Sequence, residues 1–151
     1  IVYTLRIKYK ASLLRLFYYL FLSKAIMQNT LALVVTTPPN SNLTTSAIKL
    51  VQTAIENNIK LIGVFFYQDG VLNAAKHLSI PSDEFQALSR WQQLNNDYNV
   101  PLYLCITAAE KRGLSDELSS DEHSNIDAAF TVSGLGELVE LTNKAERVVQ
   151  L

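Results

Sequence analysis

Short apolar runs alternate along this chain with stretches whose apolar residues recur at helical spacing. The first run, Leu31–Thr36, is continuous and rich in β-branched residues, as is typical of a strand covered on both faces. A second run of the same kind is Ile59–Tyr67. Between them, after Ser41, Thr44 or Thr45 as the N-cap, apolar residues lie on one helical face: Ala47, Ile48, Val51, Ala54 and Ile55. Strand, helix and strand at these distances form a βαβ unit, which indicates a parallel sheet.

The alternation continues to the end of the chain. The further predicted elements are a short helical turn (Val71–Ala75), a helix capped by Ser82 or Asp83, a strand (Val100–Leu104), a helix (Ala108–Arg112), a strand (Ala128–Val132), a helix (Glu137–Lys144) and a final strand (Arg147–Leu151). A chain of 151 residues is the length of one domain. We therefore expect an α/β fold: a single domain with a small, mostly parallel sheet flanked by helices on both faces.

The segment Ile1–Ile26 is a different kind of sequence, rich in Leu, Tyr and Phe and free of acidic residues. Arg15 interrupts the apolar region that a signal peptide would need, and the uncharged run Leu16–Ser23 is far shorter than the ~20 residues of a membrane span. A basic amphipathic helix lying on a membrane surface is an alternative. Because the only methionine, Met27, directly precedes the first predicted strand, we interpret 1–26 as a non-native or upstream-translated extension and 27–151 as the domain.

Charge and cysteine content narrow the function classes. The first segment carries five of the 13 basic residues, so eight remain against 14 acidic ones in the body of the chain. An acidic body argues against direct nucleic-acid binding, which needs cationic surface for phosphates. One cysteine excludes an intrachain disulfide and a Cys-rich metal site, and fits a reducing compartment such as the cytoplasm. Two histidines are too few for a dedicated His-based zinc site.

That cysteine, Cys105, lies between the apolar run Val100–Leu104 and the helix formers Ala108–Arg112, which Gly113 closes. Ligands and chemistry in open α/β sheets gather at the carboxyl ends of strands. A thiol at this place also lies near a helix N-terminus, whose partial positive charge favours the thiolate. The position suits a nucleophile or a sulfur carrier. The alternative is an inert buried thiol, because free cysteines are among the most buried residues.

Other candidates are weaker. The stretch Ser133–Gly136 precedes a helix and its amides would suit an anion, but it lacks the third glycine of a dinucleotide fingerprint and the lysine of a P-loop, which favours a structural turn. Asp69 and Asn73 flank Gly70 at a strand end, and each also suits an ordinary turn or helix end. His77 is interpreted as solvated. His123 belongs to the acidic stretch Leu114–Asp127, which is interpreted as a solvated loop or arm.

Several segments carry a family resemblance when they are taken together and in order. They are Val64–Tyr67 with Gly70, Val71, Asn73 and Ala74; Ser82–Phe85; Trp91–Asn95; Cys105 with Ala108, Ala109 and Lys111–Gly113; Phe130 and Thr131 with Ser133–Gly136; and Arg147–Gln150. In this pattern the chain resembles the TusD-like sulfurtransferase subunits of the DsrE family. The resemblance runs from about Leu31 to the C-terminus and leaves out Ile1–Ile26.

The resemblance implies a cytoplasmic sulfurtransferase that carries a persulfide on Cys105. It implies TusB-like and TusC-like subunits in a heterohexamer, a TusA-like sulfur donor and a TusE-like acceptor, with the sulfur ending in the 2-thio group of a tRNA wobble uridine. No metal, organic cofactor, membrane or direct nucleic-acid contact is expected. Three alternatives stay open: DsrE-type sulfur trafficking in sulfur oxidation, a non-catalytic assembly subunit with Cys105 merely buried, and a small-molecule or nucleotide-binding module that uses Ser133–Gly136.

Overall fold

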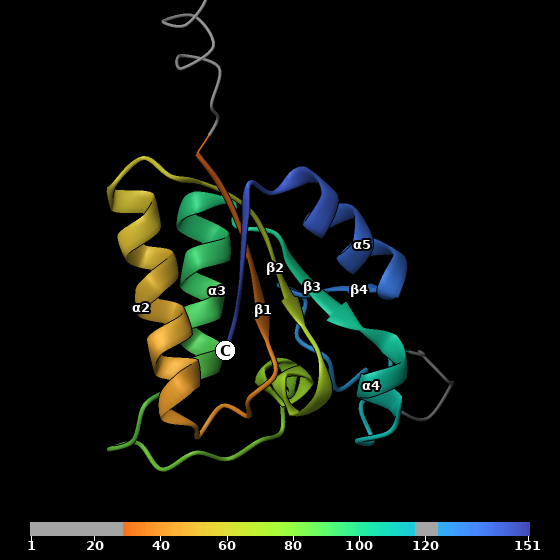
Figure 1. Cartoon of the computed structure of the whole chain (residues 1–151). Helices are drawn as coiled ribbons and strands as arrows, with labels where there is room; N and C mark the ends of the chain where they lie inside the picture. Colours follow the sequence, from red (N-terminus) through yellow and green to blue (C-terminus); the bar gives the residue numbers. More distant parts are fainter. Residues whose placement is uncertain (1–28, 117–123) are drawn as a thin grey trace, which may run out of the picture.

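The computed structural model describes residues 29–116 and 124–151 (Figure 1). The expected extension at 1–26 lies outside the described residues, as do His123 and the rest of 117–123 within the acidic stretch. The elements are β1 (Thr30–Val35), α2 (Asn42–Glu56), β2 (Lys60–Phe66), the 3₁₀ helix η1 (Gln68–Ala74), α3 (Ala87–Tyr98), β3 (Leu102–Cys105), α4 (Ile106–Glu110), β4 (Thr131–Ser133), α5 (Leu135–Lys144) and β5 (Arg147–Gln150).

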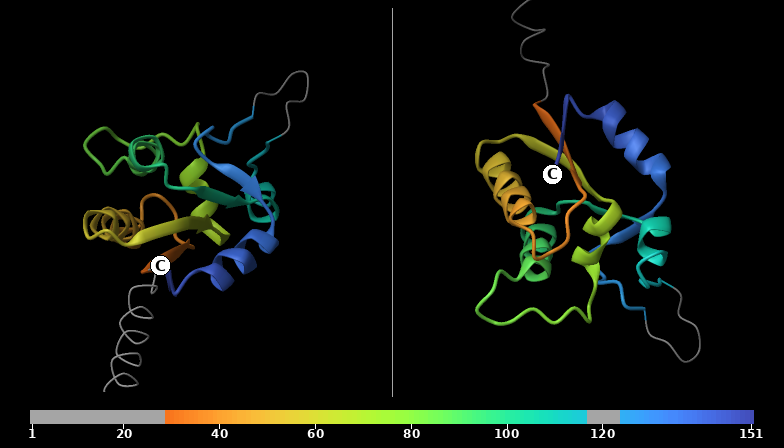
Figure 2. Two further views of the ribbon diagram at one scale, coloured as in Figure 1. Left: turned by 90° about the horizontal axis from the view of Figure 1, so that it is seen from above. Right: turned by 60° about the horizontal axis from the view of Figure 1, so that its bottom comes forward.

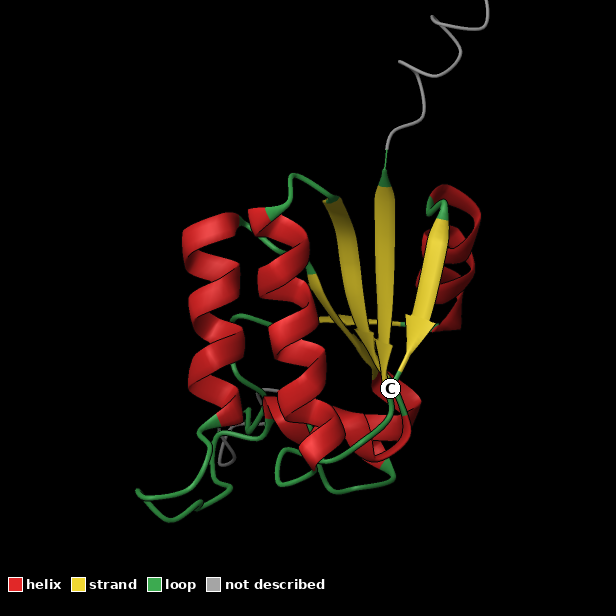
Figure 3. Cartoon of the chain, turned by 60° about the vertical axis from the view of Figure 1, so that its left-hand side comes forward, coloured by secondary structure: helices red, strands yellow, loops and turns green. Residues whose placement is uncertain are grey.

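The five strands form one sheet in the order β4-β3-β2-β1-β5, and every neighbouring pair is parallel. The helices α2 and α3 cover one face of this sheet and α5 covers the other (Figure 3). At the carboxyl ends of the strands lie η1 and α4, as the further views also show (Figure 2). The expected single α/β domain, with a parallel sheet and helices on both faces, is confirmed.

The core on the α2 and α3 side is built from the apolar faces that the sequence spacing predicts. Four residues of the α2 stripe are buried: Ala47, Ile48, Val51 and Ala54. From the strand side, Phe66 places its ring edge-to-face against Trp91, with ring centroids 5.0 Å apart. A second edge contact at 5.0 Å joins Phe66 to Phe130. Edge-to-face pairs of buried rings add specific geometry to the area they remove from water.

On the opposite face, α5 packs on the sheet around a glycine. A Cβ at Gly63 would lie 2.8 Å from the Tyr103 ring and 3.0 Å from a methyl of Leu141, so this position in β2 needs glycine for the close approach. Burial, followed by the negative charges of Glu137 and Glu140, raises the pKa of Tyr103. The phenol therefore stays neutral at physiological pH and serves as packing beneath α5.

Most element boundaries differ from the predicted ones by a residue or two, and one predicted cap is wrong. Ser41 caps α2 as expected, its hydroxyl accepting from the Leu43 amide at 3.2 Å. Neither Ser82 nor Asp83 caps α3, which begins later, at Ala87, without a side-chain cap. The reason is a local turn in which the Gln86 side chain donates to the carbonyls of Pro81 and Glu84 at 2.7 and 3.1 Å, holding this stretch outside the helix.

The start of β4 also differs from its prediction. Phe130 closes a turn by donating from its amide to the Asp127 carbonyl at 3.1 Å, and the Asp127 carboxylate accepts from the Ala129 amide at 3.0 Å. An aspartate that binds the backbone two residues on favours a turn over a strand. The strand is therefore Thr131–Ser133 instead of 128–132, and α5 begins at Leu135 instead of Glu137.

Candidate active site around Cys105

Cys105 lies at the junction of β3 and α4. It is the last residue of the strand and at the same time the N-cap of the helix, which begins at Ile106 instead of the predicted Ala108. The sequence changes character here, because the apolar strand residues end and the helix formers Ala108 and Ala109 follow. This places the sulfur at the carboxyl edge of the parallel sheet, close to the first turn of a helix, as the sequence predicts.

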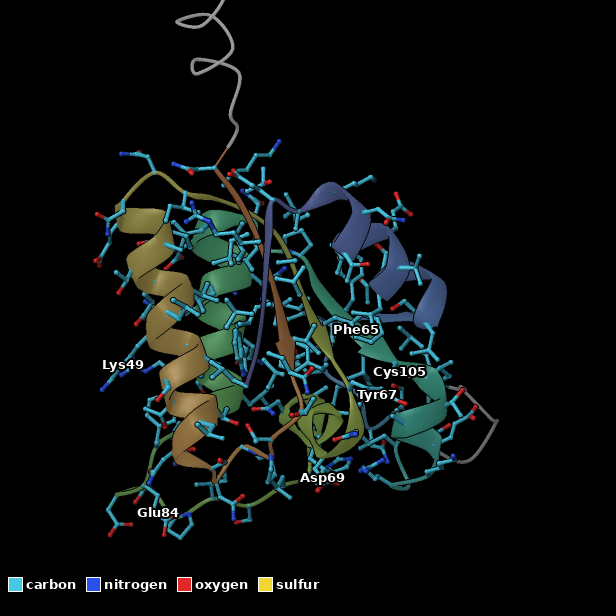
Figure 4. All side chains as sticks on the ribbon, in the orientation of Figure 1. Lys49, Phe65, Tyr67, Asp69, Glu84 and Cys105 are labelled. Atoms are coloured by element: carbon cyan, nitrogen blue, oxygen red, sulfur yellow. The ribbon has the colours of Figure 1, made fainter. Side chains whose placement is uncertain are left out.

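The thiol is buried but borders a pocket. Cys105 is only 1 % exposed. It nevertheless contributes to the wall of a pocket of about 260 Å³, together with Tyr67, Gln68, Thr107, Ala108, Lys111, Arg112 and Leu135. Figure 4 shows Cys105 and Tyr67 near one another at the ends of their strands, below α5. Cys105 is therefore almost fully covered by other side chains and yet lies in the wall of a pocket.

Two basic residues line the pocket, and their surroundings differ. Arg112 is fixed: its Nη2 and Nε lie 2.7 and 2.8 Å from one carboxylate oxygen of Asp69, and its Nη1 donates to the Ala108 carbonyl at 3.0 Å. These contacts tie α4 to η1. Lys111, next to it, is exposed and forms no ion pair within the described part of the chain. Of the two basic residues in the pocket wall, Arg112 is therefore paired with a carboxylate, and Lys111 has no ion-pair partner among the described residues.

The ion pair between Asp69 and Arg112 should contribute little to overall stability, because the Asp69 side chain is 59 % exposed. We expect Asp69→Asn to lower the free energy of unfolding by less than about 1 kcal/mol. Urea unfolding at low and at high salt measures this, and the difference between the two proteins should shrink as salt screens the pair. A loss well above that value, unaffected by salt, would contradict the assignment of an exposed pair.

The wall opposite α4 comes from the junction of β2 and η1. Gln68 has a positive φ of 51°, a conformation that costs a non-glycine residue free energy and that gathers at functional sites. Gly70 permits this tight junction, because a Cβ there would lie only 2.0 Å from the carbonyl oxygen of Val35. The backbone of η1 is thus pressed against the end of β1, which holds Tyr67 and Gln68 at the pocket.

Of the two polar residues singled out beside Gly70, only Asp69 reaches the site. Asn73 is buried and serves the fold: its amide nitrogen donates to the carbonyls of Thr37 and Gly70 at 3.0 and 2.8 Å. Its side-chain oxygen accepts from the Trp91 indole at 3.2 Å. Asn73 therefore joins η1, the segment after β1 and α3. His77 is exposed, in agreement with its solvated interpretation.

The glycine-containing stretch Ser133–Gly136 lies next to Cys105 because β4 pairs with β3 in the sheet. Ser133 ends β4 and pairs with Cys105 in the parallel register, so both side chains lie on the face that α5 covers. Gly134 is the N-cap of α5, and Leu135 lines the pocket. The Ser133 hydroxyl oxygen is buried and has no hydrogen-bond partner among the residues that the structure describes.

The chemistry available here is that of a thiol beside cationic side chains. No group of three or more His, Cys, Asp or Glu side chains in the described ranges is arranged to hold a metal ion. Sequence reasoning located the cysteine but did not assign Tyr67, Gln68 or Leu135 to its surroundings. Lys111 and Arg112 could have been assigned to the site from the sequence, because they follow the cysteine by one to two helical turns.

Comparison with known proteins places this geometry in a family. The model of the DsrE/DsrF-like family matches residues 29–151, which include Cys105 and every residue of the pocket wall. Among solved structures, the ychN protein from E. coli superposes with a TM-score of 0.66 at 21% sequence identity, covering 83% of this chain and 100% of that one. At this identity the likeness establishes a shared fold.

Within the described residues, no helix has the length and apolar character to cross a bilayer.

Proposed function

Because the chain belongs to the DsrE/DsrF-like family, which is linked to sulfur transfer, we propose that it is a persulfide carrier with Cys105 as the sulfur-bearing residue. The observation that supports this most directly is the placement of the single cysteine of the sequence in the wall of a pocket with basic residues. A persulfide is anionic, and nearby cations favour anionic sulfur.

The proposed reaction is an exchange at sulfur. The Cys105 thiolate attacks the outer sulfur of a donor persulfide, the S–S bond of the donor breaks, and the donor leaves as a thiolate. Cys105 then carries the extra sulfur as a persulfide. In the onward step an acceptor thiolate attacks that outer sulfur and Cys105 leaves as the thiolate. Each step forms one S–S bond and breaks one, so no oxidant or reductant is consumed.

A single cysteine suits a carrier. With no second cysteine in the sequence, the persulfide cannot collapse into an intrachain disulfide, and its sulfur must leave to another protein. Burial adds protection, since the thiol of a residue that is 1 % exposed meets fewer stray thiols. Both features favour a protected intermediate between two proteins over an enzyme that turns over a small substrate by itself.

The finer assignment follows the resemblance to TusD-like subunits. We propose that the chain works in the cytoplasm with TusB-like and TusC-like subunits in a heterohexamer, receives sulfur from a TusA-like donor and passes it to a TusE-like acceptor. The end product would be 2-thiolated wobble uridine in tRNA. DsrE-type trafficking in sulfur oxidation uses the same chemistry and differs in the donor and acceptor.

A second candidate function is supported by the burial of the cysteine. A thiol that is 1 % exposed also suits an assembly subunit in which Cys105 is a small core residue. The two functions differ in a single property, namely whether the sulfur atom can be reached by a persulfide.

Intact mass spectrometry after incubation with a persulfide-loaded TusA-like protein tests the proposal. We expect the chain, with its partner subunits present, to gain the mass of one sulfur atom, and digestion to place that gain on Cys105. A thiol reductant should remove it. If the chain gains no sulfur atom in the presence of the partner subunits, the assembly function is the correct one.

A further inference from the structure

Around the pocket of Cys105, the surface combines an apolar part with a free positive charge. Leu135 lines the pocket and is 52% exposed, and Val139, four residues on along α5, is 57% exposed. Residues four apart lie on the same side of a helix, so these two side chains form one apolar strip. On the α4 side, Lys111 contributes a charge without an ion-pair partner in the described residues.

Among the residues that the structure describes, no carboxylate forms an ion pair with Lys111. Asp69, which does not line the pocket, is already bound to Arg112. Glu140 pairs with Lys144 within α5, and Glu137 acts on Tyr103; neither glutamate lines the pocket. Lys111 is therefore the basic residue of the pocket wall that is exposed and has no ion-pair partner in the described ranges.

We propose that Lys111, Leu135 and Val139 form the docking surface for the sulfur-delivering protein, an inference that rests on the proposed function. This partner presents its persulfide between an apolar and an acidic side chain. The apolar side chain covers Leu135 and Val139, and the carboxylate meets Lys111. Contiguous exposed apolar surface that is rimmed by polar residues is a feature of protein interaction sites. Charges at the rim of an interface mainly set the association rate and its salt dependence.

The burial of Cys105 adds a requirement on the shape of the partner. Because Cys105 lines the pocket and is 1 % exposed, the donor cysteine would have to enter the pocket on a protruding segment, with its neighbours in sequence contacting the rim. A short peptide is therefore an adequate probe of the docking surface, since the contacts proposed here involve only the residues beside the donor cysteine.

The test uses two synthetic peptide persulfides that are identical except for one position. Both carry a leucine before the cysteine; one carries a glutamate after it and the other a lysine. The rate at which the chain, with its partner subunits, gains one sulfur atom is followed by intact mass. We expect the glutamate peptide to load Cys105 roughly threefold to tenfold faster than the lysine peptide, because an attractive exposed pair with Lys111 replaces a repulsive one. This difference should shrink at high salt.

Matched variants distinguish contacts at the docking surface from general effects of charge and hydrophobicity on the loading rate. Lys111→Glu should abolish or reverse the preference for the glutamate peptide. Lys49 is an exposed lysine on α2, across the sheet (Figure 4), and Lys49→Glu should leave the preference unchanged. Leu135→Ser should slow loading from both peptides. Leu43→Ser removes a leucine that is 48% exposed on α2 and should have no effect.

Glutathione persulfide distinguishes failure of the docking surface from failure of the carrier function. If this small persulfide loads Cys105 while both peptides load at equal rates, or while neither peptide loads at all, the docking surface is wrong and the carrier function stands. If no persulfide of any kind loads Cys105, the carrier function itself is wrong and the docking surface falls with it.

Discussion

Replacing Cys105 with serine should reduce sulfur transfer to the background rate. A serine hydroxyl is not ionised at physiological pH and forms no persulfide, so neither half of the exchange can occur. The measurement is transfer of labelled sulfur from a persulfide-loaded donor to a final acceptor, with wild type and Cys105→Ser compared in the complete assembly. Of all single substitutions in the chain, this one should have the largest effect on function.

The fold should survive this substitution, and that has to be measured beside it. A hydroxyl in this buried position costs on the order of 1–2 kcal/mol when it finds no partner, so Cys105→Ser will unfold somewhat earlier than wild type. Cys105→Ala avoids the buried hydroxyl and should be equally inactive. Thermal unfolding and size-exclusion chromatography monitor fold and assembly. Transfer at the wild-type rate in either variant would rule out the carrier function of Cys105.

Gly70→Ala should have the largest effect on stability among the glycine substitutions. The new methyl group would lie 2.0 Å from the Val35 carbonyl oxygen and 2.7 Å from its carbon, far inside van der Waals contact. That carbonyl cannot easily move, because it accepts the hydrogen bond from the Tyr67 amide at 2.9 Å. We expect the free energy of unfolding to fall by more than about 2 kcal/mol, measured by urea denaturation.

The same substitution at Gly136 is the matched control. This glycine lies in α5, and a Cβ there would meet no atom within 4 Å. Because alanine favours helix more than glycine does, Gly136→Ala should raise the free energy of unfolding by about 0.5–1 kcal/mol. If Gly70→Ala unfolds at the wild-type urea concentration, the close approach of η1 to β1 is wrong.

The sequence was sufficient for features that depend on local periodicity. The spacing from Ala47 to Ala54 predicts the buried face of α2, since that pattern concerns neighbouring turns of one helix. The runs that became β1 and β2 are apolar on both faces, which is how central strands of a parallel sheet differ from exposed ones. Cys105 was located at a strand end for the same reason: an apolar run stops there and helix formers begin.

Other features depend on residues far apart in the chain, and the sequence offered no signal for them. The ion pair of Asp69 with Arg112 joins positions 43 residues apart. The hydrogen bond between Asn73 and Trp91, and the presence of Leu135 and Cys105 in one pocket wall, also depend on how distant elements pack together. The late start of α3 has a local cause, but the Gln86 side chain competes there against two good capping residues, and propensity alone does not decide such a competition.

The position of β5 has a consequence for how the chain folds as it is synthesised. β1 is flanked by β2, which follows it closely in sequence, and by β5, which is synthesised after the other four strands of the sheet. The hydrogen bond from the Thr36 amide to the Leu151 carbonyl at 2.7 Å spans 115 residues. Until β5 has been synthesised and has left the ribosome, one edge of β1 has no partner strand and is open to pairing with other chains. Docking of β5 should therefore be a late step of folding, and the nascent chain should depend on chaperones until it occurs.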